Sequence, residues 1–239
     1  MTRQTVPLTM PLTGAQAGIW VAQRLDPGNP IYNAADRVDI RGPLDTGVFE
    51  RALERCLAEA EPLHLRFTEE PAQYLPEYDE LRGRLTVLDL RDEPDPGAAA
   101  DAWTRADLTT PVDLRTGPLS RHALLRLADD HHVWYLRVHH ILIDAYALSM
   151  LVGRMAEIYT ALADGLTPGA GPFGAMAPVV EEEAAYLASE RYERDRAYWL
   201  DRLAGAPEPV GLAGAPTLSS REVVRRRAAL PSPGHWDDL

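Results

Sequence analysis

Two apolar, β-branched runs separated by a short polar turn constrain the fold of this chain more than any other feature. Residues 120–127 and 133–140 are rich in Leu, Val and aromatic residues, and residues 128–132 between them include two aspartates and two histidines. Such a pattern predicts a β-hairpin. We expect this hairpin to be the core of the fold, with His139 and His140 at the end of its second strand.

A helix is predicted directly after the histidine pair. Apolar residues recur there every three or four positions, which is the period of a helix with one buried face. They are Leu148, Leu151, Val152, Met155, Ile158, Tyr159 and Leu162. Asp144 stands near the entrance of this helix and Gly165 lies past its exit. The histidine pair therefore ends a strand, and Asp144 opens the next element.

Further elements are predicted on both sides of the hairpin. Helices are expected over residues 12–25, 48–60 and 98–108, and short strands over 32–40, 63–67, 73–78 and 85–90. Asp45 or Thr46 is a candidate N-cap of the second of these helices.

The composition changes beyond the helix that starts near Asp144. Residues 165–178 are rich in Gly, Pro and Ala, and we expect them to be a linker that crosses between two lobes. A long helix over 179–203 and a strand over 223–230 are predicted to follow.

Composition and charge limit the class of protein. The chain has 239 residues, of which 46% are apolar and 25% charged, and its formal net charge is −12. No apolar run approaches the roughly 20 residues of a membrane helix, and residues 1–10 lack the apolar core of a secretory signal. Nucleic-acid binding needs clustered positive charge. We therefore expect a cytoplasmic globular protein with no membrane or nucleic-acid partner.

The single cysteine, Cys56, cannot form a disulfide within the chain. It falls on the apolar stripe of a predicted helix, together with Phe49, Leu53 and Leu57. We expect a buried structural thiol rather than a nucleophile.

The histidine pair is the one candidate for chemistry. Neighbouring side chains on a strand point to opposite faces, so His139 and His140 cannot share one small ligand, and a shared metal is disfavoured. A neutral imidazole at a strand end suits a general base or a hydrogen-bond donor, although a purely structural histidine is the alternative. Asp144 is placed to orient the local backbone or to pair with an arginine.

The residues from His139 to Ala145 resemble the HHxxxDG motif of nonribosomal peptide synthetase condensation domains, which belong with the chloramphenicol acetyltransferase-like acyltransferases. Residues 12–20 resemble the opening motif of that family, residues 61–67 resemble its second motif, and residues 111–119 are also typical. The resemblance spans most of the chain. It implies an α/β fold: one chloramphenicol acetyltransferase-like lobe, with a mixed β-sheet flanked by helices, plus the start of a second lobe.

The same resemblance implies peptide-bond formation between two thioesters held on carrier proteins. The acceptor amine attacks the donor acyl thioester, and His140 lies at the reaction centre. His139 and Asp144 are implied to be structural, and the aspartate of the family usually forms an ion pair with an arginine. No cofactor is expected on the chain itself. Its partners would be donor and acceptor peptidyl carrier proteins, which carry the substrates on phosphopantetheine.

Three departures from the family pattern modify these expectations. Ala145 replaces the usual Gly, and its methyl group is added where the pantetheine arm would pass, so we expect slower transfer or an altered choice of donor. His64 stands where Arg is common, which leaves Arg66 as the nearest partner for Asp144. The chain is also shorter than the family's two-lobed domains.

We therefore expect residues 1–165 to form the N-terminal lobe, residues 166–178 to be the crossover, and residues 179–239 to begin a truncated C-terminal lobe.

Four alternatives stay open. The chain is an epimerisation domain with the same fold, a free-standing alcohol or CoA acyltransferase of the superfamily, a catalytically incomplete lobe that only docks carrier proteins, or a metal-binding protein. The opening and second motifs favour the peptide synthetase branch, and the strand geometry disfavours the metal.

Overall fold

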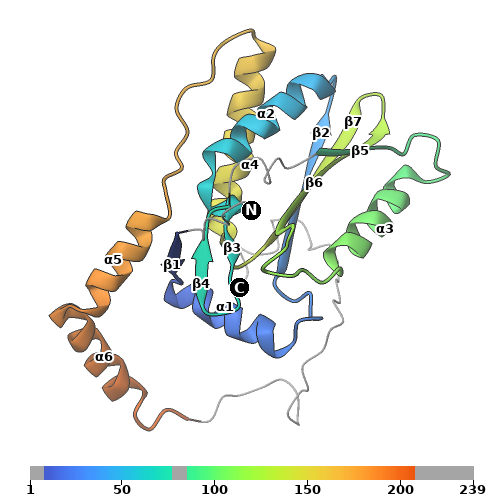
Figure 1. Cartoon of the computed structure of the whole chain (residues 1–239). Coiled ribbons are helices and arrows are strands. Elements are labelled where there is room, and N and C mark those ends of the chain that lie inside the picture. The colour runs from blue at the N-terminus through green and yellow to red at the C-terminus, as the bar shows by residue number, and fades with distance from the viewer. Residues whose placement is uncertain (1–7, 77–84, 208–239) are drawn as a thin grey trace, which may run out of the picture. The chain divides into compact units, whose positions relative to one another are not determined.

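The computed structural model describes residues 8–76 and 85–207, and the predicted hairpin lies at the centre of its larger sheet (Figure 1). Strands β6 (Ser120–Ala128) and β7 (His131–His139) pair antiparallel. The hairpin prediction is confirmed with one correction. β7 ends at His139, and His140 is the first residue of the following turn, although its backbone N–H still donates to Tyr32 O at 2.7 Å.

The larger sheet has four strands in the order β2-β7-β6-β5. β2 (Asn33–Arg41) pairs antiparallel with β7, whereas β5 (Leu85–Asp89) pairs parallel with β6. The sheet is therefore mixed, as predicted, and β7 has a hydrogen-bonded neighbour on each side.

Alternating side chains of the hairpin build one apolar cluster on each face of the sheet. Trp134, Leu136 and Val138 pack with residues of α2 (Thr46–Glu59) and α4 (Ala145–Ala163). The intervening side chains pack against α3 (Pro96–Leu108) on the other face. Helices thus flank both faces of the sheet (Figure 1), which confirms the predicted fold class.

A second, three-stranded sheet has the order β1-β4-β3. Its strands are β1 (Thr9–Pro11), β3 (Arg66–Phe67) and β4 (Ala72–Tyr74). The predicted strand over 63–67 is wrong in its first half, because residues Glu61–His64 form a 3-10 turn with a proline in its first turn. The predicted strand over 73–78 ends at Tyr74, and its last two positions lie outside the described residues.

Polar N-caps define where the helices begin. Thr13 caps α1 (Gly14–Leu25) through a capping box. Aspartates cap the next three helices, each accepting a hydrogen bond from a backbone N–H three residues later; they are Asp45, Asp95 and Asp144. Gly165, at φ +70°, follows the end of α4, where a left-handed residue suits glycine. The predicted boundary residues of α4 are both confirmed.

The single long helix predicted over 179–203 is wrong. Two helices occupy this region, α5 (Ala177–Leu187) and α6 (Glu190–Leu203). The break falls at Ser189, whose hydroxyl accepts from the Tyr192 N–H at 3.2 Å and so starts a new helix. The predicted strand over 223–230 lies outside the described residues.

Residues 165–178, predicted to be a crossover linker, are anchored to α4 and to the turn Glu61–His64. Arg154 donates to the Gly169 carbonyl, and the Met176 N–H donates to Glu61 Oε1 at 2.7 Å. Gly171 lies so close to the Glu59 carboxylate that a Cβ atom would stand 2.1 Å from Oε2. Gly171 therefore permits close packing of this segment against Glu59. The predicted lobe boundaries themselves stay a prediction.

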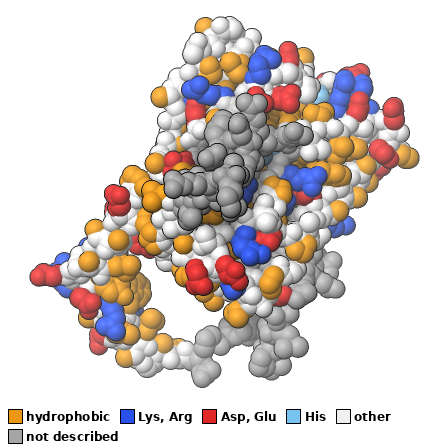
Figure 2. Space-filling view, viewed as in Figure 1, with side chains coloured by type: hydrophobic (Ala, Val, Ile, Leu, Met, Phe, Trp, Pro, Cys, Tyr) orange, Lys and Arg blue, Asp and Glu red, His pale blue; other side chains and the backbone are white. Residues whose placement is uncertain are grey.

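Apolar side chains remain exposed on α6 (Figure 2). Tyr198, Trp199, Leu200 and Leu203 are each about 60% exposed. None of the helices in the described ranges is long and apolar enough to cross a membrane.

Candidate active site

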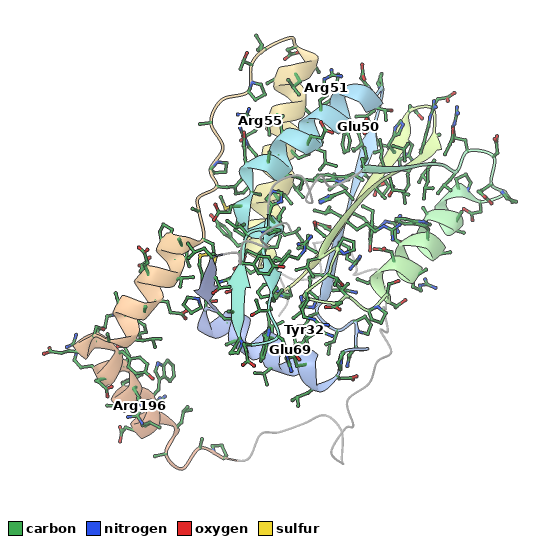
Figure 3. All side chains as sticks on the ribbon, in the orientation of Figure 1. Tyr32, Glu50, Arg51, Arg55, Glu69 and Arg196 are labelled. Atoms are coloured by element: carbon green, nitrogen blue, oxygen red, sulfur yellow. The ribbon has the colours of Figure 1, made fainter. Side chains whose placement is uncertain are left out.

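The two histidines lie where β7 runs into the turn before α4. Main-chain hydrogen bonds fix their backbone: the His139 N–H donates to Leu119 O at 2.8 Å, and the Leu142 N–H donates to His139 O at 3.0 Å. The His140 N–H also donates to Tyr32 O. The turn is therefore bonded to the residue before β6, Leu119, and to the residue before β2, Tyr32. Tyr32 is labelled in Figure 3, and its ring centroid lies 6.0 Å from that of His139.

The His139 side chain is buried. It is 2% exposed, its Nε2 lies 3.2 Å from Gln23 Oε1, and its Nδ1 lies 3.3 Å from the Ile141 N–H. Burial lowers the pKa of His139 to about 4, and the nearby charge of Arg137 acts in the same direction. The ring is therefore neutral near pH 7, which agrees with a structural role.

The His140 side chain is exposed, and its orientation is set from within the turn. Its Nδ1 lies 2.9 Å from the Ile143 carbonyl oxygen. A carbonyl can only accept a hydrogen bond, so the proton of the neutral ring is on Nδ1. The Nε2 atom then carries the lone pair, and it is the atom of this ring that can take a proton from a reactant.

Asp144 and Ala145 form the start of α4. Asp144 Oδ1 accepts from the Ala147 N–H at 2.8 Å, so the carboxylate caps the helix that follows the histidines. Ala145 is exposed, and within the described ranges no residue other than glycine has a positive φ. The alanine therefore occupies this exposed position without backbone strain.

Among the described residues, Arg66 and Asp144 form no ion pair with each other. Arg66 Nη1 donates to the Leu65 carbonyl at 2.9 Å, and its guanidinium lies against Gly117. No ion pair of Asp144 is found in the part of the chain that the structure describes. His64, which stands where the family commonly has Arg, donates from Nε2 to Leu57 O at 2.7 Å. The Arg66–Asp144 pair stays a prediction.

A buried polar network next to His139 was missed in the sequence. Asp107, from α3, accepts from Arg137 Nε at 2.7 Å, Arg121 Nη1 at 2.8 Å and the Tyr135 hydroxyl at 2.9 Å. Burial and the Asp107 charge raise the pKa of Tyr135. Arg137 is the residue from which this network could have been predicted in the sequence, because a cation inside a run of buried strand residues requires a buried anion.

A pocket opens beside α1 rather than at His140. It encloses about 490 Å³, is lined by Trp20, Gln23, Arg24 and the segment 111–115, and contains neither His140 nor Asp144. Within residues 8–76 and 85–207, no three His, Cys, Asp or Glu side chains gather as metal ligands would. Cys56 is buried as predicted, and burial raises the pKa of its thiol to about 12.

Comparisons with known proteins agree with the motifs. The family model described as "Condensation domain" matches residues 7–232. A dimodular nonribosomal peptide synthase of Bacillus subtilis (strain 168) is 45% identical over 230 residues, which are 95% of this chain and 10% of that protein. An isonitrile lipopeptide synthase of Streptomyces coeruleorubidus is 44% identical over 218 residues, 90% of this chain and 15% of that protein.

Solved structures match the fold. The starter condensation domain of rhizomide synthetase, in a complex with C8-CoA and Leu-SNAC, superposes with a TM-score of 0.82 at 38% identity, covering 87% of this chain and 48% of that one. The first condensation domain of the calcium-dependent antibiotic synthetase, with a substrate analogue, gives 0.76 at 38% identity, covering 86% and 50%. The chain therefore spans about half the length of these condensation domains.

Proposed function

Because the chain belongs to the condensation-domain family of nonribosomal peptide synthetases, we propose that it takes part in amide-bond formation between two carrier-bound thioesters. The donor is an acyl or peptidyl thioester and the acceptor an aminoacyl thioester. Both are held on the phosphopantetheine arms of partner carrier proteins. The chain itself supplies the histidine at the reaction centre and needs no bound cofactor for this step.

The proposed step exchanges a thioester for an amide. The acceptor nitrogen attacks the donor carbonyl carbon, a C–N bond forms, and the C–S bond of the donor breaks. The amine loses one proton and the departing thiolate gains one, so no external oxidant or reductant is required. An α-amino group has a pKa of about 8, so a substantial fraction is already neutral near pH 7.

One observation carries this assignment: His140 is exposed and its Nδ1 lies 2.9 Å from Ile143 O, so that in the neutral ring Nδ1 donates and Nε2 has the lone pair. An acceptor on the solvent side of the turn is suited to orient the attacking amine and to take its proton. We assign His139 and Asp144 to support, since one is buried below the turn and the other caps α4. Ala145 would border the path of the donor arm.

The test is turnover with an acyl-carrier donor and an aminoacyl-carrier acceptor. It is run on this chain and on a version extended to the full length of the solved condensation domains, each with and without His140→Ala. We expect the extended parent to form the amide and the variant to lose at least about 100-fold in kcat, as for a general base. Equal rates would remove His140 from the reaction centre.

A second candidate function is a docking lobe that binds carrier proteins without turnover. The exposure of His140 favours it, because acyl transfer depends on walls that exclude water and position both substrates. Binding of both carriers without amide formation, in the extended protein as well, would support this candidate. Inversion of the α-carbon of a carrier-bound peptide would instead identify an epimerisation domain.

A further inference from the structure

Helix α1 buries two polar residues and leaves two of its apolar residues exposed. Gln16 and Gln23 are its two buried residues, whereas Val21 is 50% and Leu25 83% exposed. Residues seven apart lie on the same helix face, so the two glutamines point in one direction. A buried amide is unfavourable unless it is hydrogen-bonded. The burial of these amides therefore points to specific partners.

The amide of Gln23 has one possible orientation. Its Nε2 lies 3.3 Å from Asp26 O, 3.3 Å from Pro27 O and 3.1 Å from Asn29 O. All three oxygens can only accept, so the atom facing them is the NH₂ group. The other end of the amide, Oε1, is left as the acceptor that faces His139 at 3.2 Å.

The orientation of this amide determines where His139 carries its proton. Because Gln23 Oε1 can only accept, the neutral ring of His139 must carry its hydrogen on Nε2. Its Nδ1 then has the lone pair, and it accepts from the Ile141 N–H at 3.3 Å. The two adjacent histidines thus hold opposite tautomers, His139 with the proton on Nε2 and His140 with the proton on Nδ1.

The turn that contains His140 is held through these bonds. His139 binds the Ile141 N–H, and Gln16 of the same helix lies 3.4 Å from the Ile141 carbonyl oxygen. Ile141 follows His140 directly. Its backbone N–H is bonded to His139, which contacts Gln23 of α1, and its carbonyl oxygen is bonded to Gln16 of α1. A change in the His139 ring would release the first of these bonds and let the His140 backbone move.

We infer that Gln23 is a positioning residue: its amide fixes the proton of His139 on Nε2, and through His139 and Ile141 it fixes the turn that presents Nε2 of His140. The inference rests on the proposed function only for its effect on turnover. Its structural part, the tautomer of His139, can be measured without any reaction.

The first experiment is a two-bond ¹H–¹⁵N NMR spectrum of the histidine rings in the full 239-residue chain near pH 7. We expect the Nε2–H pattern for His139 and the Nδ1–H pattern for His140. An Nδ1–H pattern for His139 would overturn the inference, whatever the activity.

Two variants then test the role of the amide. Gln23→Leu removes its acceptor and donors, and we expect the His139 signals to broaden and kcat in the extended protein to fall about tenfold, the scale of one or two neutral hydrogen bonds. We expect kcat to change more than KM, because a positioning residue acts on the turn through His139 rather than by contact with a substrate. Val21→Ala, on the exposed face of the same helix, is the control and should change neither the spectrum nor kcat.

Gln23→Glu supplies the conservative variant. A carboxylate still accepts from His139 Nε2, but it cannot donate to the three carbonyl oxygens that the NH₂ group of Gln23 faces. We therefore expect His139 to keep its proton on Nε2, its pKa to rise because the negative charge favours the imidazolium, and kcat to lie between those of the parent and Gln23→Leu. If Gln23→Leu fails to fold, the histidine-ring spectra of Gln23→Glu and of the parent still test whether Gln23 fixes the proton of His139. Unchanged ring spectra and unchanged kcat in the variants would refute the role of Gln23. A fully active His140→Ala protein with the expected spectra would refute the proposed function alone.

Discussion

Replacing Asp107 with Asn should destabilise the fold more than any other single change of one charged group in the described ranges. The Asp107 and Arg137 side chains are both 3% exposed, and their N–O distance is 2.7 Å. The asparagine keeps one accepting oxygen but loses the charge, so the guanidinium of Arg137 stays buried without a full counter-charge. Removing one partner of a buried ion pair typically costs about 3–5 kcal/mol.

That loss is a large part of the about 5–15 kcal/mol by which a domain is stable. Three donors converge on Asp107, from Arg137, Arg121 and the Tyr135 hydroxyl, and an amide cannot accept from all three in the same way. We therefore expect Asp107→Asn to fall at the upper end of the range, near 4 kcal/mol. Urea denaturation followed by circular dichroism measures the difference in free energy of unfolding.

The matched control is Asp129→Asn. Its carboxylate is 83% exposed and pairs with Arg91 and Arg126, so its loss should change stability by less than about 1 kcal/mol. Replacing Arg137 by Met in the Asp107→Asn background should recover part of the loss, because no buried cation remains. A loss for Asp107→Asn no larger than that of the control would refute the reasoning, since the network would then contribute nothing beyond a surface pair.

Three further predictions concern other parts of the molecule. Gly171→Ala should lose about 1–3 kcal/mol in the same assay, because its Cβ would displace the Glu59 carboxylate, whereas Gly169→Ala, with open space around its Cβ, should lose less than 1. Burial lowers the pKa of His122 to about 4, and neither ring nitrogen has a partner. The unfolded chain binds this proton below about pH 6.5, so the contribution of His122 to stability should fall by about 3 kcal/mol between pH 6.5 and 4, and His122→Phe should remove that part of the pH dependence. Ala145→Gly should raise turnover of the extended protein with bulky donors and lower stability by less than about 1 kcal/mol, measured by carrier-bound product formation and urea denaturation.

Local signals explain what could be predicted from the sequence. The hairpin follows from apolar runs on both sides of a polar turn, and the start of α4 follows from an aspartate before an apolar repeat. Both involve residues close together in the chain. The break between α5 and α6 is also local, but Ser189 is only mildly unfavourable inside a helix, so the periodic pattern alone does not separate a cap from an interior position.

Contacts between distant residues explain what could not be predicted. Gln23 and His139 are 116 positions apart, and Arg137 and Asp107 are 30 apart. Neither pair is part of a motif with fixed spacing. A buried glutamine is also indistinguishable in sequence from the exposed polar residues of an amphipathic helix, so the burial of Gln16 and Gln23 appears only when their partners are in place.

The position of β7 has a consequence for the motions that this site allows. A strand with hydrogen-bonded neighbours on both sides releases its amide protons only when the sheet itself opens, so hydrogen exchange along β7 should report the global free energy of unfolding. His139, at the end of that strand, shares this protection, whereas the exposed face of α6 should exchange at much lower free energy. The turn at His140 therefore starts from the end of a strand that opens only with the whole sheet.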